Sequence, residues 1–261
     1  MGLAWSYCVL DRRGDVVKEC DAGRLHPTAS IGKVFLLCEI AERICDGRLD
    51  PLAPLVRQPG LQVADSGLWQ HLAHTSLPLV DACVLVAAVS DNWATNVLID
   101  LVGLGSVAAR AEALGCTDSG LHDRVRDVRT AADAVTLSTG TARELAEVAR
   151  RIHVSADGGV VAGLSSQAAR VVEGWLLMGV DLSLVAAPFR LDPLAHTSGP
   201  VRLWSKTGTD TCIRADMGAV RGESDMVAYA AIATWEAGVD RVADAFDRMH
   251  GLGAELASRM W

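Results

Sequence analysis

The sequence contains very little lysine. Of its 24 basic residues only Lys18, Lys33 and Lys206 are lysines, and all the others are arginines. A residue type that is kept so rarely is informative wherever it occurs. Arginine stays protonated in proteins, so it cannot replace a lysine that has to give up its proton.

The features needed for large charged partners are also missing. Acidic residues outnumber basic ones, the formal charge is -8, and the arginines are scattered along the chain. A chain of this charge without a basic patch does not suit nucleic acid or an anionic membrane surface. No apolar run approaches the roughly 18 residues of a membrane span. The sequence therefore predicts neither nucleic acid nor a membrane as partner.

Cysteine and histidine show no pattern of paired or clustered use. The seven cysteines are scattered without a CxxC pair, and most stand in apolar runs, where a free thiol behaves as a small hydrophobe. The first residues lack the basic and then apolar segments of an export signal. We therefore expect a cytoplasmic protein, unless a leader was replaced by the first methionine. The seven histidines have no metal-ligand spacing, so neither a metal nor another cofactor is expected.

The two ends of the chain are predicted to form strands and the middle to form helices. Short β-like runs flank a polar turn near the N-terminus, and three more precede an amphipathic C-terminal helix. The predicted strands are 4–10, 16–19, 201–205, 217–220 and 226–233, and the last helix is 239–260. The predicted middle helices are 31–45, 68–73, 80–88, 94–102, 107–114, 142–152 and 167–178, followed by a long loop over 184–200.

This order of elements predicts a mixed α/β (α+β) fold in a single domain over residues 1–261. The α/β lobe takes in about 1–30 and 190–261, so that both chain ends build one antiparallel sheet. An all-helical middle lobe over about 31–189 packs against that sheet.

The first motif that carries chemistry is the segment 30–33, Ser-Ile-Gly-Lys, at the start of the first predicted helix. Positions three apart share a helix face, so the hydroxyl of Ser30 and the amine of Lys33 can meet. A serine becomes a good nucleophile when a neighbouring base takes its proton, and a buried lysine can be that base. An isolated match of this kind is more often a helix cap with a solvated lysine.

The second and third motifs are Ser-Asp-Asn at 90–92 and Lys-Thr-Gly-Thr at 206–209. Ser90 can relay a proton to a leaving nitrogen, and the amide of Asn92 can orient a substrate. The third motif ends an apolar strand, and its glycine permits close approach of the backbone. Taken singly, the second motif is a common N-cap and the third a common strand end. Together, the motifs follow the order S-x-x-K, S-D-N, K-T-G and contain two of the three lysines. This triplet is known from class A β-lactamases and penicillin-binding proteins.

With these motifs the chain resembles the class A β-lactamase family, over nearly its whole length. The resemblance implies that Ser30 is acylated, Lys33 is its proton partner, Ser90 is the relay, and Asn92 binds the substrate amide. It also implies that Lys206 and Thr207, next to Gly208, bind a substrate carboxylate. The backbone N–H groups of Ser30 and Thr209 would form the oxyanion hole. Arg214 would help with the carboxylate, although a plain surface arginine is equally compatible with the sequence.

One departure from the family concerns the removal of the acyl group. The family has a glutamate between the second and third motifs that activates the deacylating water. The matching stretch here, 121–130, has no glutamate, and Arg126 falls near that place. Asp127 is the candidate substitute, shorter by one methylene.

The sequence thus predicts an active-site-serine acyl hydrolase or acyltransferase for a β-lactam or related cyclic amide or ester, with slow deacylation. A β-lactamase for self-resistance and an intracellular biosynthetic enzyme both fit this hypothesis. The alternative from another class is a β-lactam-binding or sequestering protein without turnover. Fold alone does not decide between them, because function lies in the site.

Overall fold

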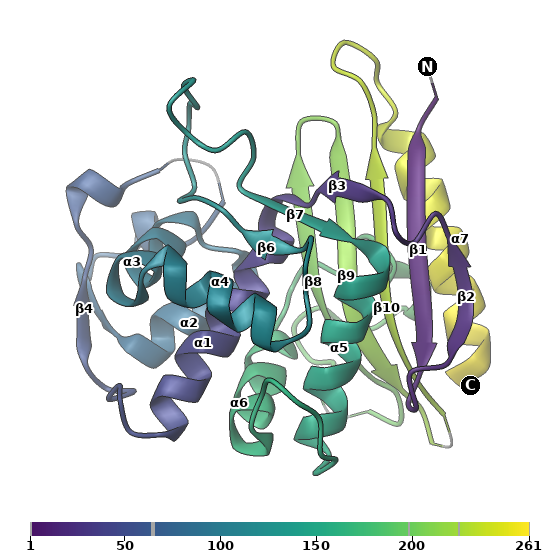
Figure 1. Ribbon diagram of the computed structural model, residues 1–261, viewed down its shortest axis with the longest axis horizontal. Coiled ribbons are helices and arrows are strands. Elements are labelled where there is room, and N and C mark those ends of the chain that lie inside the picture. The colour runs from purple at the N-terminus through teal and green to yellow at the C-terminus, as the bar shows by residue number, and fades with distance from the viewer. Residues whose placement is uncertain (1, 64–65, 198, 224, 261) are drawn as a thin grey trace.

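The computed structural model describes residues 2–63, 66–197, 199–223 and 225–260 (Figure 1). The remaining residues, including both ends of the predicted 1–261 domain, lie outside the described part. The main sheet has five strands in the order β2-β1-β10-β9-β8, and each neighbouring pair is antiparallel. Its strands are β1 (Ala4–Asp11), β2 (Val16–Cys20), β8 (Arg202–Asp210), β9 (Ile213–Arg221) and β10 (Met226–Thr234).

Both chain ends contribute to this sheet, as the sequence predicts. The first strand, β1, pairs with the last strand, β10, from Ala4 opposite Thr234 to Asp11 opposite Val227. Figure 1 shows them side by side, purple against yellow-green. The mixed α/β fold with an antiparallel sheet and a helical lobe is therefore confirmed.

The sheet is covered by helices on both faces, and the sequence of β10 reflects this. Alternate residues of β10 point to opposite sides, so Ala228 and Ile232 join the larger core while Val227 and Tyr229 join the smaller one. The smaller core is closed by α7 (Val242–Met260), and the larger one includes α5 (Ala142–Ala156). A strand buried on both faces needs an almost continuous apolar run, which β10 has.

The helical part stands beside the sheet at the left of Figure 1. Its helices are α1 (Lys33–Cys45), α2 (Leu79–Val89), α3 (Asn92–Val102), α4 (Leu104–Ala113) and α6 (Ser166–Leu176). Short strands form two small sheets, β3 (Leu25–Pro27), β7 (Ser138–Thr141) and β6 (Gly120–Leu121) in one, and β4 (Pro54–Val56) and β5 (Ser76–Pro78) in the other. Within the described ranges no single helix could cross a membrane by length and composition, although the bent pair α3 and α4 together passes that test.

Two sequence predictions were wrong in detail. The helix expected at 68–73 is only a 3-10 turn, Trp69–His71, because the backbone N–H groups of Leu68 and Trp69 donate to the side chain of Asp91. The strand expected to end before Lys206 continues to Asp210. The residues of the Lys-Thr-Gly-Thr motif belong to the strand, because they pair with β9 next to a tight hairpin turn. The short strands of the small sheets were not predicted, since runs of two to four residues carry little periodicity.

Candidate active site

Ser30 lies on a short 3-10 helix, η1 (Ala29–Gly32), which leads directly into α1. The residue before it, Ala29, has a left-handed backbone with φ of 49°. A residue with a Cβ in this region is strained, and strain of this kind is often found at functional sites. The turn packs against β8, where a Cβ on Gly208 would lie 2.3 Å from the backbone oxygen of Thr28. Glycine at 208 therefore allows the strand to approach the serine turn.

Lys33 joins the first motif to the second. Its side chain is completely buried in α1, and its Nζ donates to the Oδ1 of Asn92 at 2.8 Å. It also donates to the backbone oxygen of Ser90 at 2.8 Å and to its Oγ at 3.1 Å. Ser90 adopts φ of 56° as the C-cap of α2, while Asp91 caps α3 through the backbone N–H of Ala94. The sharp turn between the two helices thus aims the Ser90 hydroxyl at the lysine.

Lys206 belongs to β8 and is 2% exposed. Its Nζ donates to the backbone oxygen of Thr207 at 2.9 Å. Burial lowers the pKa of Lys206 from 10.5 to about 8, and the nearby Asp181 and Asp216 oppose that shift by favouring the ammonium form. Burial also raises the pKa of Asp216, which accepts hydrogen bonds from the Tyr229 hydroxyl and the Val185 backbone.

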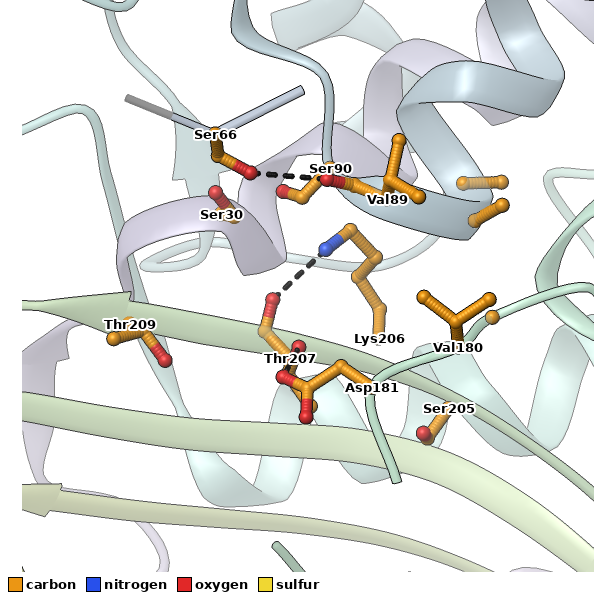
Figure 2. A pocket seen from close by; sticks show the side chains of 13 residues that line it. Ser30, Ser66, Val89, Ser90, Val180, Asp181, Ser205, Lys206, Thr207 and Thr209 are labelled. Carbon is orange, nitrogen blue, oxygen red and sulfur yellow. Dashed lines mark hydrogen bonds between the residues drawn. The ribbon is translucent and has the colours of Figure 1, made fainter. Parts of the chain in front are cut away.

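These side chains meet at a cavity of about 330 Å³. Ser30 and Ser90 lie on one side of it and Lys206 and Thr207 on the other (Figure 2). The remaining lining comes from the loop after α6, the end of α2, and three polar residues, Ser66, Ser205 and Thr209. The three motifs, far apart in the sequence, therefore converge on one cavity.

A second cavity, of about 410 Å³, adjoins the first and shares Ser30, Ser66 and Thr209 with it. Its further polar lining includes Asn92, Arg126 and Asp127. None of the described residues that line either cavity is a glutamate. That Asp127 substitutes for the family's glutamate, and that deacylation is slow, both stay predictions.

The loop that carries Asp127 is fixed from two directions. Asn96 of α3 accepts from the backbone N–H of Val125 at 2.8 Å and donates to its oxygen at 2.9 Å. Arg126 donates to Asp123 at 2.8 Å and lies 3.0 Å from Asp133. The guanidinium is therefore occupied by carboxylates of its own loop, and Val125, Arg126 and Asp127 all line the cavity.

Arg214 lies near the tip of the β8–β9 hairpin, opposite Thr209 in the strand register, and is not among the described residues that line either cavity. Its guanidinium donates to the backbone oxygens of Ile213 at 2.7 Å and Asp210 at 3.0 Å, and lies over the ring of Trp235. Its role in holding a substrate carboxylate stays a prediction, as do the roles assigned to the other site residues.

Asp181 is a site residue that the sequence analysis missed. It lines the first cavity and accepts from the Oγ1 of Thr207 at 2.7 Å. The loop after α6 brings it there, and no spacing in the sequence connects residue 181 with the third motif. Its signal was an acidic residue in an apolar stretch, which by itself predicts nothing more than a turn.

The arrangement provides the groups needed for acyl transfer through a serine. It combines a half-buried serine that lines the cavity, a lysine bonded to a second hydroxyl, and a strand whose Gly208 passes beside the backbone of Ser30. Within the described ranges no group of three or more His, Cys, Asp or Glu side chains could hold a metal ion.

Comparisons with known proteins identify the family and the fold. The sequence model of the family described as "Beta-lactamase enzyme family" matches residues 3–249. No curated protein sequence matches the chain.

Several solved structures share the fold. A β-lactamase from Sphaerobacter thermophilus DSM 20745 is 21% identical, with a TM-score of 0.81 over 98% of this chain and 90% of that one. A mutant of PBP-A, solved as an acyl-enzyme complex with penicillin G, is 18% identical, with a TM-score of 0.76 over 98% and 90%. A class A β-lactamase from Mycobacterium abscessus is 16% identical, with a TM-score of 0.78 over 99% and 94%. At these identities the likeness shows the fold.

Proposed function

Because the chain belongs to the beta-lactamase enzyme family, we propose that it is an active-site-serine acyl hydrolase or acyltransferase whose acyl-enzyme breaks down slowly. Its substrate in this proposal is a β-lactam or a related cyclic amide or ester. Ser30 is the nucleophile, Lys33 and Ser90 move the protons, and the strand of Lys206 binds the substrate.

The observation that carries the proposal is the hydrogen bonding of Lys33. Its Nζ contacts both the Oγ of Ser90 and the Oδ1 of Asn92, and Ser90 shares a cavity with Ser30. A lysine kept only for stability would gain little from burial, since removing an ammonium from water is costly. Its position at the junction of two motifs supports a role in proton transfer instead.

Acylation in this proposal moves one proton from Ser30 to the leaving nitrogen by way of Lys33 and Ser90. The Ser30 Oγ attacks the substrate carbonyl carbon and gives its proton to the neutral amine of Lys33, and a tetrahedral intermediate forms whose carbonyl oxygen carries the negative charge. The carbonyl then re-forms as the bond from its carbon to nitrogen breaks, which leaves the ester Oγ–C(=O). Ser90 passes a proton to the departing nitrogen while it takes one from Lys33. The backbone N–H groups of Ser30 and Thr209 stabilise the oxyanion.

Slow deacylation is proposed because the second cavity offers no described glutamate. Removing the acyl group needs a base beside a water, and such help is worth roughly 10²–10⁴ in rate. Arg126 is bonded to Asp123 and Asp133 and stays protonated, which leaves Asp127 as the acidic side chain of this loop lining the cavity. The PBP-A mutant described as an acyl-enzyme with penicillin G is a relative in fold that forms such an intermediate.

The alternative is a protein that binds β-lactams without turnover. The absent glutamate favours it, because a stable acyl-enzyme or a non-covalent complex would serve sequestration. The bonded Lys33 favours the enzyme, since binding alone does not need a buried lysine that contacts the Ser90 hydroxyl.

Time-resolved intact-protein mass spectrometry with a panel of β-lactams and activated esters tests the proposal. A β-lactam opens without losing atoms, so the expected adduct equals the whole ligand mass and decays over minutes. An activated ester should add only its acyl group. Ser30→Ala should show neither adduct.

Labelling that persists in Ser30→Ala would remove Ser30 from the mechanism. Absence of any adduct, together with tight reversible binding, would favour the alternative.

A further inference from the structure

Asp181 places a carboxylate at the end of the first cavity where Lys206 and Thr207 lie. One of its oxygens accepts from the Thr207 Oγ1 at 2.7 Å, as Figure 2 shows. The other accepts from the Oγ of Ser183 at 2.6 Å and from its backbone N–H at 3.2 Å. Although Asp181 is exposed, three hydrogen bonds from two elements thus fix the orientation of its carboxylate.

The same carboxylate acts on the only lysine of this cavity. Asp181 and Asp216 are the two groups whose negative charge favours the ammonium form of Lys206. Asp216 is itself buried, with a raised pKa, and bonds to Tyr229 and Val185, which belong to the smaller core. Asp181, which lines the cavity, is therefore the partner that a bound ligand would meet.

A substrate carboxylate at this end would need the Thr207 hydroxyl and the Lys206 ammonium. The hydroxyl already donates its one proton to Asp181. An incoming carboxylate would also lie beside a fixed carboxylate, and like charges brought into contact repel each other. The described lining of this cavity contains one lysine, one aspartate and no arginine, so Lys206 is the cation among these lining residues that could offset the repulsion.

We propose that Asp181 is a specificity-determining residue that occupies the place of a substrate carboxylate, so that the natural substrate is a cyclic amide or ester with an uncharged or cationic group at this end. This inference rests on the proposed function and narrows its substrate class. A hydrogen-bond donor on the substrate, such as a hydroxyl, amide or ammonium group, would meet the Asp181 carboxylate. An ordinary penicillin, which carries a carboxylate there, would be disfavoured.

Matched probes test this directly. A chromogenic β-lactam as its free acid and as its methyl ester differ only in the charge in question. The second-order rate constant of acylation is measured for each with the wild-type chain, Asp181→Asn and Asp247→Asn. Asparagine can still bond to Thr207 and Ser183, so the loop is preserved. Asp247 lies on α7, away from both Ser30 cavities, and its variant has the same net charge as Asp181→Asn.

We expect the wild-type chain to prefer the methyl ester by roughly tenfold or more, as one like-charge contact would give. Asp181→Asn should reduce or reverse that ratio by raising the rate for the acid, and Asp247→Asn should leave it unchanged. A wild-type preference for the acid, or an unchanged ratio in Asp181→Asn, would overturn the proposal.

A binding measurement separates this inference from the proposed function. Ser30→Ala and the double variant Ser30→Ala/Asp181→Asn are titrated calorimetrically with the same acid and ester. If neither probe acylates the wild-type chain, the proposed function fails. The Asp181 proposal is then upheld by tighter binding of the ester to Ser30→Ala and overturned by tighter binding of the acid.

Discussion

The side chain of Lys206 is a buried cation, and this gives the stability of the protein a predictable dependence on pH. Its pKa is about 8 in the folded protein and near 10.5 when exposed. Between these values the unfolded chain binds a proton at this lysine that the folded chain does not. The free energy of unfolding should therefore rise with pH across this window, relative to a chain without the lysine.

Between pH 7.5 and 10.5 we expect the free energy of unfolding of the wild-type chain to rise by roughly 3 kcal/mol more than that of Lys206→Met. Urea unfolding of both proteins across this range measures the difference and cancels the titration of other groups. If the free energy of unfolding changes with pH in the same way in both proteins, Lys206 titrates in the folded chain as it does in water.

Asp127 is the described acidic residue of its loop that faces the second cavity. If it activates the deacylating water, Asp127→Asn should slow the residual loss of the acyl group by at least roughly tenfold, while the rate of acylation stays the same. The decay of the adduct in intact-protein mass spectrometry measures this. An unchanged decay would exclude Asp127 as the base.

Val125 offers a way to supply the base that the loop lacks. Its backbone is fixed by Asn96, and Val125 lines the second cavity together with Ser30. Val125→Glu should therefore accelerate deacylation by roughly 10²-fold or more. Val128→Glu, on the same loop but 78% exposed and away from the cavity, is the matched control and should change nothing. Equal effects of the two variants would point to charge alone.

At the scale of elements, the site depends on how closely β8 approaches η1. Gly208 faces the Thr28 oxygen so closely that any Cβ must push the strand away from the serine turn. Gly208→Ala should lower the acylation rate by at least roughly 10²-fold, because a displacement of about 1 Å has this cost. It should also destabilise the fold by about 1–3 kcal/mol, as overpacking does.

The control for this change is Gly251→Ala on α7, where no atom lies within 4 Å of the added Cβ. Alanine is the better helix former, so this variant should be more stable by about 0.5–1 kcal/mol and fully reactive. Acylation by Gly208→Ala at the wild-type rate would show that the strand and the turn can separate without loss.

The sequence was most informative about elements with a long, regular pattern. The apolar run of β10 and the spacing of α7 predicted a sheet with both chain ends, because burial on two faces or on one stripe leaves a clear trace. The 68–73 segment misled, since its apolar spacing is helical but the buried Asp91 takes its backbone donors. Such a long-range contact leaves no local signal.

In the candidate site, the residues that belong to short motifs could be predicted from the sequence, and the others could not. Ser30, Ser90 and Lys206 belong to short motifs, and the structure brings all three to one cavity. Asp181 was not predictable, because its partner Thr207 lies on another element and only the fold joins them. Arg214 was predicted to bind a substrate carboxylate from its position after the third motif. The direction of its guanidinium depends on contacts with Asp210 and Trp235, which that position does not show.

At the scale of the whole molecule, the charge of -8 acts on every ligand that approaches. Salt screens this repulsion over about 10 Å at 0.1 M ionic strength. The acylation rate constant for the free-acid probe should therefore rise by several-fold between about 10 mM and 500 mM salt, and that for the methyl ester should stay flat. Stopped-flow absorbance with both probes measures this. A fall in the rate for the acid would reveal a local positive field at the entrance.

The pairing of β1 with β10 also determines when the main sheet can be completed during synthesis. The first strand to leave the ribosome finds its central partner only after Met226–Thr234 has been made. Until then one edge of β1 has unsatisfied backbone groups, and an open edge is a template for pairing between chains. Ser30, made early, likewise waits for the strand of Lys206. A nascent chain would therefore be both inert toward acylating ligands and prone to aggregation until nearly its last helix, and covalent labelling of Ser30 would report completed chains alone.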